Sequence, residues 1–448
     1  MSERLCSVGL DVGTTSTQLV VSRLTIENRA SSFAVPEMEI ARREILYKSP
    51  VYFTPLLEES RVDGAAIREI VEAEYRKAGI TRETVDTGAI IITGETSRKE
   101  NARAVLTALS DLAGDFVVAT AGPDLESVLA AKGAGAVEHS AQTGKTVLHM
   151  DIGGGTSNLA LIRDGKIMAT GCLNVGGRLL KFDKAGVLTY ISPVLTGICG
   201  AKVGDTVKQE QVEALADTLV QALEMAAGLR EPGQLLDHFR TEEAGVLWTP
   251  PLGPVVLSFS GGVADCIGQT YPPLEFGDMG PVLGQAIRKS RLCRGDYVLG
   301  EETIRATVIG AGCHSAQLSG STVFHQNVPL PMKNVPVVNI SDPSSIAREL
   351  SKQEGKAVIA MPGLAAPSYR EVAAMAEAIV AQTGEEILLC LEQDMAKALG
   401  QALALRLPQT ARLLCIDRVK VSEGSYLDIG TPVAHAFPVV VKTLVLGR

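Results

Sequence analysis

The chain has 448 residues, a formal net charge of -9, and 46% hydrophobic and 21% charged residues. This composition supports sizeable hydrophobic cores, and the length predicts two or three domains. The acidic balance argues against a nucleic-acid partner, because nucleic-acid-binding proteins neutralise phosphates with lysine and arginine. The sequence has no long uncharged apolar run of the kind that spans a bilayer, so we also expect no membrane partner.

The cysteines indicate a reducing compartment. All eight are scattered, and none forms a C-x-x-C pair that would indicate a zinc or redox site. The first residues also lack the apolar stretch of a signal peptide. We therefore expect a cytoplasmic protein with reduced thiols.

A repeated pattern appears in two distant parts of the chain. The stretch "DVGTTSTQLVV" begins at Asp11, and "DIGGGTSNLAL" begins at Asp151. In each copy, apolar stretches flank a turn of small residues, which is the pattern of a β-hairpin. After the second copy, Asp164 and Gly165 form a dipeptide typical of a second hairpin turn. Such distant copies indicate a duplicated domain.

Both helices and strands are predicted between and after the two copies. We expect strands at 89–93, 115–120 and 254–262, and helices at 98–113, from about 124, and near 208–228. Asp124 is placed to cap the helix that it begins. The segment 304–320 is predicted to form a strand, a tight turn and the start of a helix. Each half is thus mixed α/β with antiparallel hairpins, which excludes a simple doubly wound sheet.

The C-terminal third continues the α/β pattern, but the pattern does not attach it to the duplication. Strands are predicted near 335–340, 356–361 and 412–421, and helices near 369–383 and 391–405. The expected domains are therefore a first lobe at 1–144, a second lobe at 145–322 and a C-terminal α/β region at 323–448.

The two repeated turns have the composition of a phosphate-binding site. Backbone N–H groups and hydroxyls donate to phosphate oxygens, and glycine lets the backbone come close. A carboxylate repels phosphate, but it can hold a Mg²⁺ ion that is itself bound to phosphates. One such turn alone is more often an ordinary hairpin. Two turns with the aspartate at the same offset favour a polyphosphate gripped from both sides.

Five segments, in order, resemble the signatures of the actin-like ATPases, the superfamily of actin, Hsp70 chaperones and sugar kinases. They are "LDVGTTSTQLVV", "ATAGPDLESVLAAKGAGAV", "MDIGGGTSNLALI", "VVLSFSGGVAD" and "IRATVIGAGCHSA". They resemble, in turn, the first phosphate motif, the first connecting helix, the second phosphate motif, the adenosine motif and the second connecting helix. The resemblance covers roughly residues 5–320. It implies an α/β fold with two duplicated actin-like (RNase H-like) lobes around a nucleotide cleft.

The resemblance also implies the cofactors ATP and Mg²⁺ and a set of site residues. Glu126 falls where Hsp70-type proteins carry the acid that positions water, and Asp151 is the second expected catalytic residue. The expected metal-binding residues are Asp11, Asp151 and Asn158. The small residues of the motifs are expected to bind the nucleotide: Gly13, Thr14, Thr15, Ser16, Gly153, Gly154, Gly155, Thr156, Gly261, Gly262, Gly310 and Gly312.

Two features depart from the Hsp70 pattern. Its second phosphate motif ends in aspartate, where this chain has Asn158, so we expect weaker Mg²⁺ binding or slow turnover. The cation that contacts the γ-phosphate has no clear match, and Lys48 and Arg42 are both left open.

From end to end, the chain resembles the ethanolamine ammonia-lyase reactivating factors of ethanolamine utilisation. The stretches that carry the resemblance include "ITGETSRKENA", "GLDVGTTSTQLV" and "AFPVVVKTLVLG". It implies a chaperone-like factor with slow ATPase activity, whose partner is ethanolamine ammonia-lyase and which exchanges damaged cobalamin for intact cofactor. A homodimer and a place within a bacterial microcompartment are left open. So are two other functions on the same fold, a small-molecule kinase and an ATP-gated scaffold with little hydrolysis.

Overall fold

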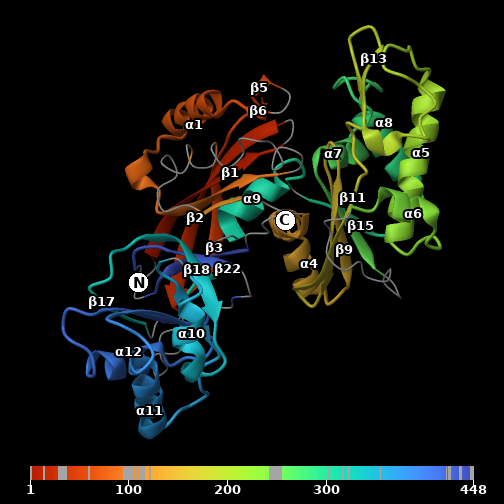
Figure 1. Cartoon of the computed structure of the whole chain (residues 1–448). Helices are drawn as coiled ribbons and strands as arrows, with labels where there is room; N and C mark the ends of the chain where they lie inside the picture. Colours follow the sequence, from red (N-terminus) through yellow and green to blue (C-terminus); the bar gives the residue numbers. More distant parts are fainter. Residues whose placement is uncertain are drawn as a thin grey trace.

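The computed structural model arranges the chain around three larger β-sheets (Figure 1). The residues that it describes are 3–13, 16–28, 38–58, 61–93, 105, 109, 117–120, 123–241, 255–300, 302–314, 317–319, 323–353, 355–419, 421, 425–432 and 436–443.

The first lobe is built on a sheet with the strand order β3-β2-β1-β7-β8. Its strands are β1 (Glu3–Val12), β2 (Ser16–Asn28), β3 (Met38–Lys48), β7 (Thr87–Ile92) and β8 (Val117–Thr120), and β4 (Tyr52–Phe53) pairs with β2. The first three strands run antiparallel, whereas β7 and β8 run parallel to β1. The helix α1 (Gly64–Ala78) covers one face, where Ile67 and Val71 pack with Val8 and Leu10. A short hairpin, β5 (Leu56–Glu58) and β6 (Arg61–Val62), precedes this helix.

The second lobe repeats this topology with the order β11-β10-β9-β14-β15. Its strands are β9 (Val147–Ile152), β10 (Ser157–Arg163), β11 (Lys166–Leu173), β14 (Val256–Ser260) and β15 (Tyr297–Leu299). Again the first three strands are antiparallel and the last two run parallel to the first. Asp164 and Gly165 form the predicted turn between β10 and β11, both with positive φ. The duplication of an RNase H-like sheet is therefore confirmed.

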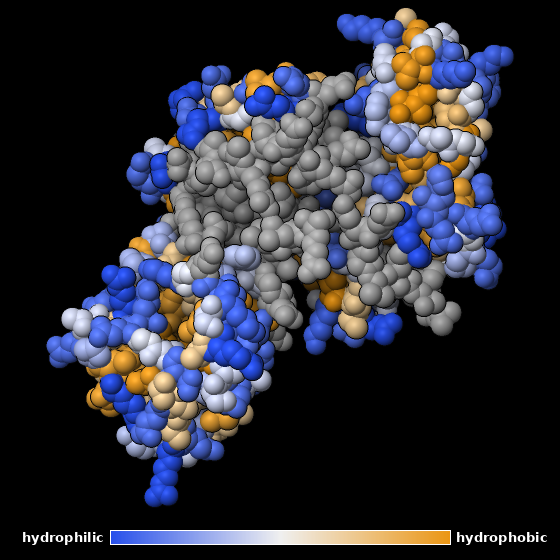
Figure 2. Space-filling model, in the orientation of Figure 1, coloured by the Kyte–Doolittle hydropathy of each residue, from blue (hydrophilic) through white to orange (hydrophobic). Residues whose placement is uncertain are grey.

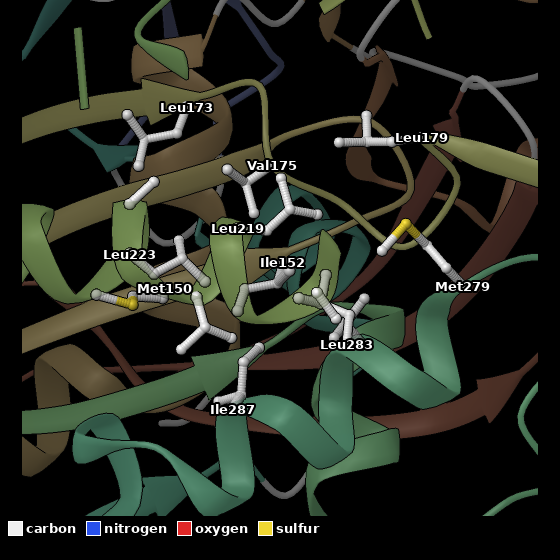
Figure 3. Packing of buried hydrophobic residues seen from close by; sticks show 14 of the residues in the cluster. Met150, Ile152, Leu173, Val175, Leu179, Leu219, Leu223, Met279, Leu283 and Ile287 are labelled. Carbon is white, nitrogen blue, oxygen red and sulfur yellow. The ribbon is translucent and has the colours of Figure 1, made fainter. Parts of the chain in front are cut away.

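Four helices and a small hairpin complete the second lobe. The helices are α5 (Gln209–Ala226), α6 (Gln234–Phe239), α7 (Gly262–Gly268) and α8 (Gly280–Lys289), and the hairpin is β12 (Leu180–Phe182) with β13 (Leu188–Ile191). Figure 3 shows the core that they close: Met150 and Ile152 of β9 lie among Leu219 and Leu223 of α5 and Leu283 of α8. This packing fixes the strand that ends at Asp151.

Three helices connect the lobes at the centre of the molecule. The helices α3 (Pro123–Gly133) and α4 (Ala136–Thr143) pack on β9, β10 and β11, whereas α9 (Ala306–His314) packs on β1, β2 and β7. Figure 1 shows α9 against the first sheet, and α3 packs directly on α9. The boundary expected at residue 144 separates the first two sheets, whereas the strand β16 (Gln317–Leu318), which lies before residue 322, belongs to the sheet of the C-terminal region. Each sheet of the two lobes is also covered by a helix from the other side of residue 144.

The C-terminal region forms its own eight-stranded sheet with the order β16-β23-β22-β18-β19-β20-β21-β17. The strands are β16 (Gln317–Leu318), β17 (Phe324–Gln326), β18 (Met332–Asn339), β19 (Val358–Met361), β20 (Glu386–Leu391), β21 (Arg412–Asp417), β22 (Ser425–Ile429) and β23 (Pro438–Thr443). The helices α10 (Ile346–Leu350), α11 (Tyr369–Val380) and α12 (Ala396–Ala404) alternate with the parallel strands β18 to β21. Contacts of β16 with β3 and of β23 with β8 place this sheet against the first lobe.

Two local predictions are wrong. The segment 304–320 does not begin with a strand, because residues 306–314 form α9 and, among the other described residues of the segment, Gln317–Leu318 are extended. The small residues of α9 pack against other backbones. A short apolar run in the sequence does not show whether it forms a buried helix or a strand. Asp124 does not precede its helix either, since α3 begins at Pro123. The predicted helix at 98–113 lies almost wholly outside the described residues.

The described residues carry both polar and apolar side chains at the surface. None of their helices is both long and apolar enough to cross a bilayer. Figure 2 shows hydrophilic and hydrophobic residues mixed on the second lobe and on the C-terminal region. Among the exposed large apolar residues of the second lobe are Met168, Val203 and Phe276.

The contact between α3 and α9 allows a direct test of the fold. A Cβ added at Gly310 would lie 2.0 Å from the backbone oxygen of Leu129. We therefore expect Gly310→Ala to destabilise the protein by about 1–3 kcal/mol, because the two backbones would have to separate. Thermal unfolding should show a clearly lower Tm. The control is Gly295→Ala, since a Cβ at this exposed glycine would meet nothing within 4 Å. Equal Tm values for the two variants would contradict the packing.

Candidate functional site

Two aspartates at equivalent strand ends form the centre of the candidate site. Asp11 lies near the end of β1 and Asp151 near the end of β9. Side chains alternate along a strand, so Asp11 points away from the core that holds Leu10 and Val12. By the same alternation, Asp151 points away from the core that holds Met150 and Ile152 (Figure 3). Both aspartates therefore face the region where α3 and α9 cross.

The turns after the two aspartates close in the same way. We call residues 11–16 aspartate turn 1 and residues 151–156 aspartate turn 2. In turn 1 the N–H of Gly13 donates to the oxygen of Ser16 at 2.8 Å, and in turn 2 the N–H of Gly153 donates to the oxygen of Thr156 at 2.9 Å. Gly153 and Gly154 are half-buried and Gly155 is exposed. Thr14 and Thr15 lie outside the described residues.

Burial makes Asp11 a weak acid. Its carboxylate accepts a hydrogen bond from the hydroxyl of Thr93 at 2.9 Å, and its residue is only 7% exposed. Loss of hydration raises the pKa of Asp11 to about 7, the Thr93 hydrogen bond opposes this shift, and the charge of Asp151 adds to it. The effect of Asp151 shows that the two duplicated strand ends lie within electrostatic reach of one another.

Asp151 lies at the end of a chain of buried hydrogen bonds. Its carboxylate accepts from the hydroxyl of Ser260 and is also hydrogen-bonded to Thr307 on α9. Burial raises the pKa of Asp151 to about 6, although the two hydrogen bonds act to lower it. Beyond Ser260, the Nε2 of His149 lies 2.9 Å from the Ser260 hydroxyl and its Nδ1 lies 3.0 Å from that of Ser258.

His149 fits this series of hydrogen bonds as a neutral ring with its proton on Nε2. Burial lowers the pKa of His149 to about 3, so the ring is neutral. Because the single hydroxyl proton of Ser260 goes to Asp151, the Nε2 of His149 donates to Ser260 and its Nδ1 accepts from Ser258. The chain of donors therefore ends on Asp151 and fits an ionised carboxylate there.

Two buried amides complete the set of oxygen atoms. Gln18 is the antiparallel neighbour of Asp11, and Asn158 is that of Asp151, so each amide shares a sheet face with its aspartate. The Oε1 of Gln18 and the Oδ1 of Asn158 are buried and have no hydrogen-bond partner within the described residues. Unpaired buried acceptors are costly, which indicates that these oxygens have another partner.

This set of oxygens fits a hydrated magnesium ion. Mg²⁺ prefers oxygen ligands, keeps several waters and takes only one or two carboxylates. The described residues contain no group of three or more histidine, cysteine, aspartate or glutamate side chains placed to hold a metal. Asp11 and Asp151, with the amide oxygens of Gln18 and Asn158, would therefore bind the ion largely through water.

The glycines of the other motifs lie at backbone contacts. Gly261 has φ +87, and a Cβ there would lie 2.3 Å from the oxygen of Ile152, so this glycine lets the end of β14 approach β9. Gly262 follows as the first residue of α7. Gly310 contacts the backbone of Leu129, and Gly312 contacts that of Gly9. The contribution of all four to nucleotide binding stays a prediction.

Glu126 lies in the first turn of α3 and is half-buried, as the sequence predicts for its place in the helix. In the same turn, Asp124 accepts a hydrogen bond from the hydroxyl of Thr170 on β11 at 2.6 Å. Two strand spacings, roughly 10 Å, separate β11 from β9. The beginning of α3 is therefore held over β11, two strands away from the strand of Asp151.

Neither cation that the sequence left open has a clear relation to the turns. Lys48, at the end of β3, forms an ion pair with Glu302. Arg42 is exposed in the middle of β3. Gln18, Thr93, Ser260 and Thr307 were not among the predicted site residues. Gln18 has a signal in the sequence, since it aligns with Asn158 in the repeat.

Comparison with known proteins gives full-length matches. The family model described as ethanolamine utilisation protein EutA matches residues 3–447. The chain is 40% identical to the ethanolamine ammonia-lyase reactivase EutA of Salmonella typhimurium and 39% identical to that of Escherichia coli, with 99% of each chain covered in both cases. Among solved structures, the ethanolamine utilisation protein EutJ of Carboxydothermus hydrogenoformans matches 68% of this chain and 89% of its own, at 18% identity and a TM-score of 0.34. A structural likeness this low supports no further conclusion.

The raised pKa of Asp11 predicts that the ligand-free protein loses stability as the pH rises. The unfolded chain releases this proton near pH 3.8 and the folded protein near pH 7. The folded state binds the extra proton between these values, so its added stability is present below about 3.8 and lost as the pH rises through about 7. We expect Asp11→Asn to raise Tm at pH 8, where each kcal/mol added to the free energy of unfolding shifts Tm by roughly 2–4 °C. The rise in Tm at pH 5 should be smaller.

The control for this measurement is Asp217→Asn on the exposed side of α5, which should change Tm equally at both pH values. A gain for Asp11→Asn that does not depend on pH would contradict the burial of its charge.

Proposed function

Since the chain belongs to the EutA family of ethanolamine utilisation proteins, we propose that it is an ATP-dependent reactivating factor for ethanolamine ammonia-lyase. In this proposal it acts as a slow ATPase and promotes the exchange of damaged cobalamin on the lyase for intact cofactor. The observation that carries it is the 40% identity, along the whole chain, to a protein with that name.

The two aspartate turns are the proposed nucleotide site. Their backbone N–H groups and hydroxyls would donate to the phosphates from both lobes. Mg²⁺, when bound, would neutralise phosphate charge. Asp11 and Asp151 would ionise against that charge, which reverses the effect of burial on their pKa values. Asn158 would contribute an uncharged oxygen and so bind Mg²⁺ more weakly than an aspartate. This supports a slow rather than a fast ATPase.

Glu126 is the proposed group that orients the attacking water. It lies in the first turn of α3, where the positive end of the helix favours an ionised carboxylate. A carboxylate there repels the phosphate, but it accepts a hydrogen bond from a water and can take its proton.

Contacts between the lobes provide a route from the site to the rest of the molecule. The amide of Gln18 donates to the oxygen of Ile304 at 3.0 Å, and Arg305 donates to the oxygen of Ser49 at 3.0 Å. Closure of the two turns around a nucleotide would shift residues 304–305 and the helix α9 that follows them. The C-terminal sheet, which contacts β3 and β8, would then move with the first lobe.

One observation favours a second candidate function. Asn158 stands where Hsp70-type proteins have an aspartate, so ATP binding with little hydrolysis, as in an ATP-gated scaffold, is the alternative. The two functions differ in whether hydrolysis is needed for repeated reactivation.

The decisive experiment is reactivation of the lyase. Ethanolamine ammonia-lyase inactivated with cyanocobalamin is incubated with the protein, adenosylcobalamin, ATP and Mg²⁺. We expect lyase activity to return, and to return only when both ATP and Mg²⁺ are present. No recovery under these conditions would overturn the proposed function.

Glu126→Gln separates the two candidate functions. The change keeps the size of the side chain and removes its charge. We expect near-normal ATP binding and a hydrolysis rate about 10²–10⁴-fold lower in single-turnover measurements, because loss of a general base has that effect. Repeated reactivation of the lyase should stop.

Glu138→Gln, at an exposed position in the first turn of α4, is the matched control and should hydrolyse ATP normally. A rate for Glu126→Gln within twofold of wild type would remove Glu126 from the site. Full reactivation without hydrolysis would favour the ATP-gated scaffold.

A further inference from the structure

The segment that follows β11 runs back along aspartate turn 2. The N–H of Gly177 donates to the oxygen of Gly153 at 3.0 Å, and the N–H of Arg178 donates to the oxygen of Gly154 at 2.6 Å. A Cβ added at Gly176 would lie 2.3 Å from the oxygen of Gly154. The segment is therefore held to the turn by direct backbone contact.

The side chain of Arg178 lies over Gly154. A Cβ added at Gly154 would meet the Cδ of Arg178 at 3.3 Å and its Cβ and Cγ at 3.5 Å. The absence of a side chain at Gly154 thus makes room for the aliphatic part of Arg178. With 27% of its side chain exposed, the arginine lies at the surface of the turn and is accessible to a ligand there.

Asp278 holds the guanidinium in place. The Nε of Arg178 donates to the Oδ2 of Asp278 at 2.9 Å, and the Oδ1 of Asp278 accepts from the N–H of Gly280 at 2.8 Å. Each partner is followed in the chain by a residue of the second-lobe core, Leu179 and Met279 (Figure 3). Both ends of the ion pair are therefore anchored, and within the described part of the chain the two terminal nitrogens of Arg178 remain as donors for a further acceptor.

We propose that Arg178 binds the terminal phosphate of the nucleotide. This inference rests on the proposed function, because it assigns a cation to the same site. An anchored guanidinium beside a glycine turn is suited to phosphate oxygens, which it can bind through two parallel N–H groups. It also supplies the positive charge that two buried carboxylates and a phosphate chain require. The structure places Lys48 in an ion pair with Glu302 and leaves Arg42 exposed in the middle of β3, whereas Arg178 packs directly on Gly154 of aspartate turn 2.

The test compares the binding of two nucleotides. Arg178→Met keeps the aliphatic stem over Gly154 and removes the charge. Calorimetry in the presence of Mg²⁺ would give the Kd values for a non-hydrolysable ATP analogue and for ADP. We expect affinity for the analogue to fall by about 10- to 100-fold, the range for loss of a hydrogen bond to a charged group. Affinity for ADP, which lacks the terminal phosphate, should stay within about twofold of wild type.

Arg230→Met is the matched control. Arg230 donates from Nε to the buried Glu224 at 2.9 Å in the same lobe, so its loss leaves a similar unpaired carboxylate away from the turn. We expect this variant to bind both nucleotides as wild type does. Arg178→Lys keeps the positive charge but lacks the two parallel N–H groups of the guanidinium. We expect it to lose less affinity than Arg178→Met, and again to lose it for the analogue and not for ADP. It provides the test if Arg178→Met does not fold.

Each other outcome overturns the inference. Equal losses for the analogue and ADP would show that Arg178 only supports the shape of the turn. Unchanged affinity for both would show that it does not reach the phosphates. In either case binding by the wild-type protein would leave the proposed function intact. If the wild-type protein bound neither nucleotide, the proposed function and this inference would both be wrong.

Discussion

The direct backbone contact of α9 with β1 and α3 is the constraint on which the rest of this structure depends. A Cβ at Gly9 would lie 2.4 Å from the oxygen of Val308, and one at Gly133 would lie 1.8 Å from that of Ala306. Helices usually pack at distances set by side chains, so this approach is possible only with glycine. It brings the two duplicated sheets together, with Asp11 and Asp151 facing the same space. Thr307, on the helix between them, bonds Asp151 directly.

Burying two carboxylates in one region costs free energy, because each loses hydration. Burial opposes their charged forms, and each is only partly compensated by hydroxyl donors. Two amide oxygens on the same faces have no partner within the described residues. A bound cation would relieve all four groups at once. Under the proposed function, a metal-bound phosphate chain would therefore stabilise the folded protein.

The phosphate chemistry of the two aspartate turns stays a prediction, but the sequence alone predicts the strands around them and the duplication, and both are confirmed. These follow from local patterns: apolar residues alternate along β1 and β9, and small residues mark the turns. Full-length resemblance then gave the family, which the comparisons confirm.

The groups that surround the two aspartates are brought there by contacts between parts of the chain that lie far apart in the sequence. Thr93, Ser260 and Thr307 come from three different elements, and His149 reaches Asp151 only through Ser260. The segment 304–320 has the composition of a strand, a tight turn and the start of a helix, yet residues 306–314 form one helix, whose Gly310 and Gly312 pack on other backbones. The ion pair between Arg178 and Asp278 likewise joins distant parts of the chain. Local sequence fixes the period of an element, whereas the partners of a side chain depend on contacts between elements, which no local pattern encodes.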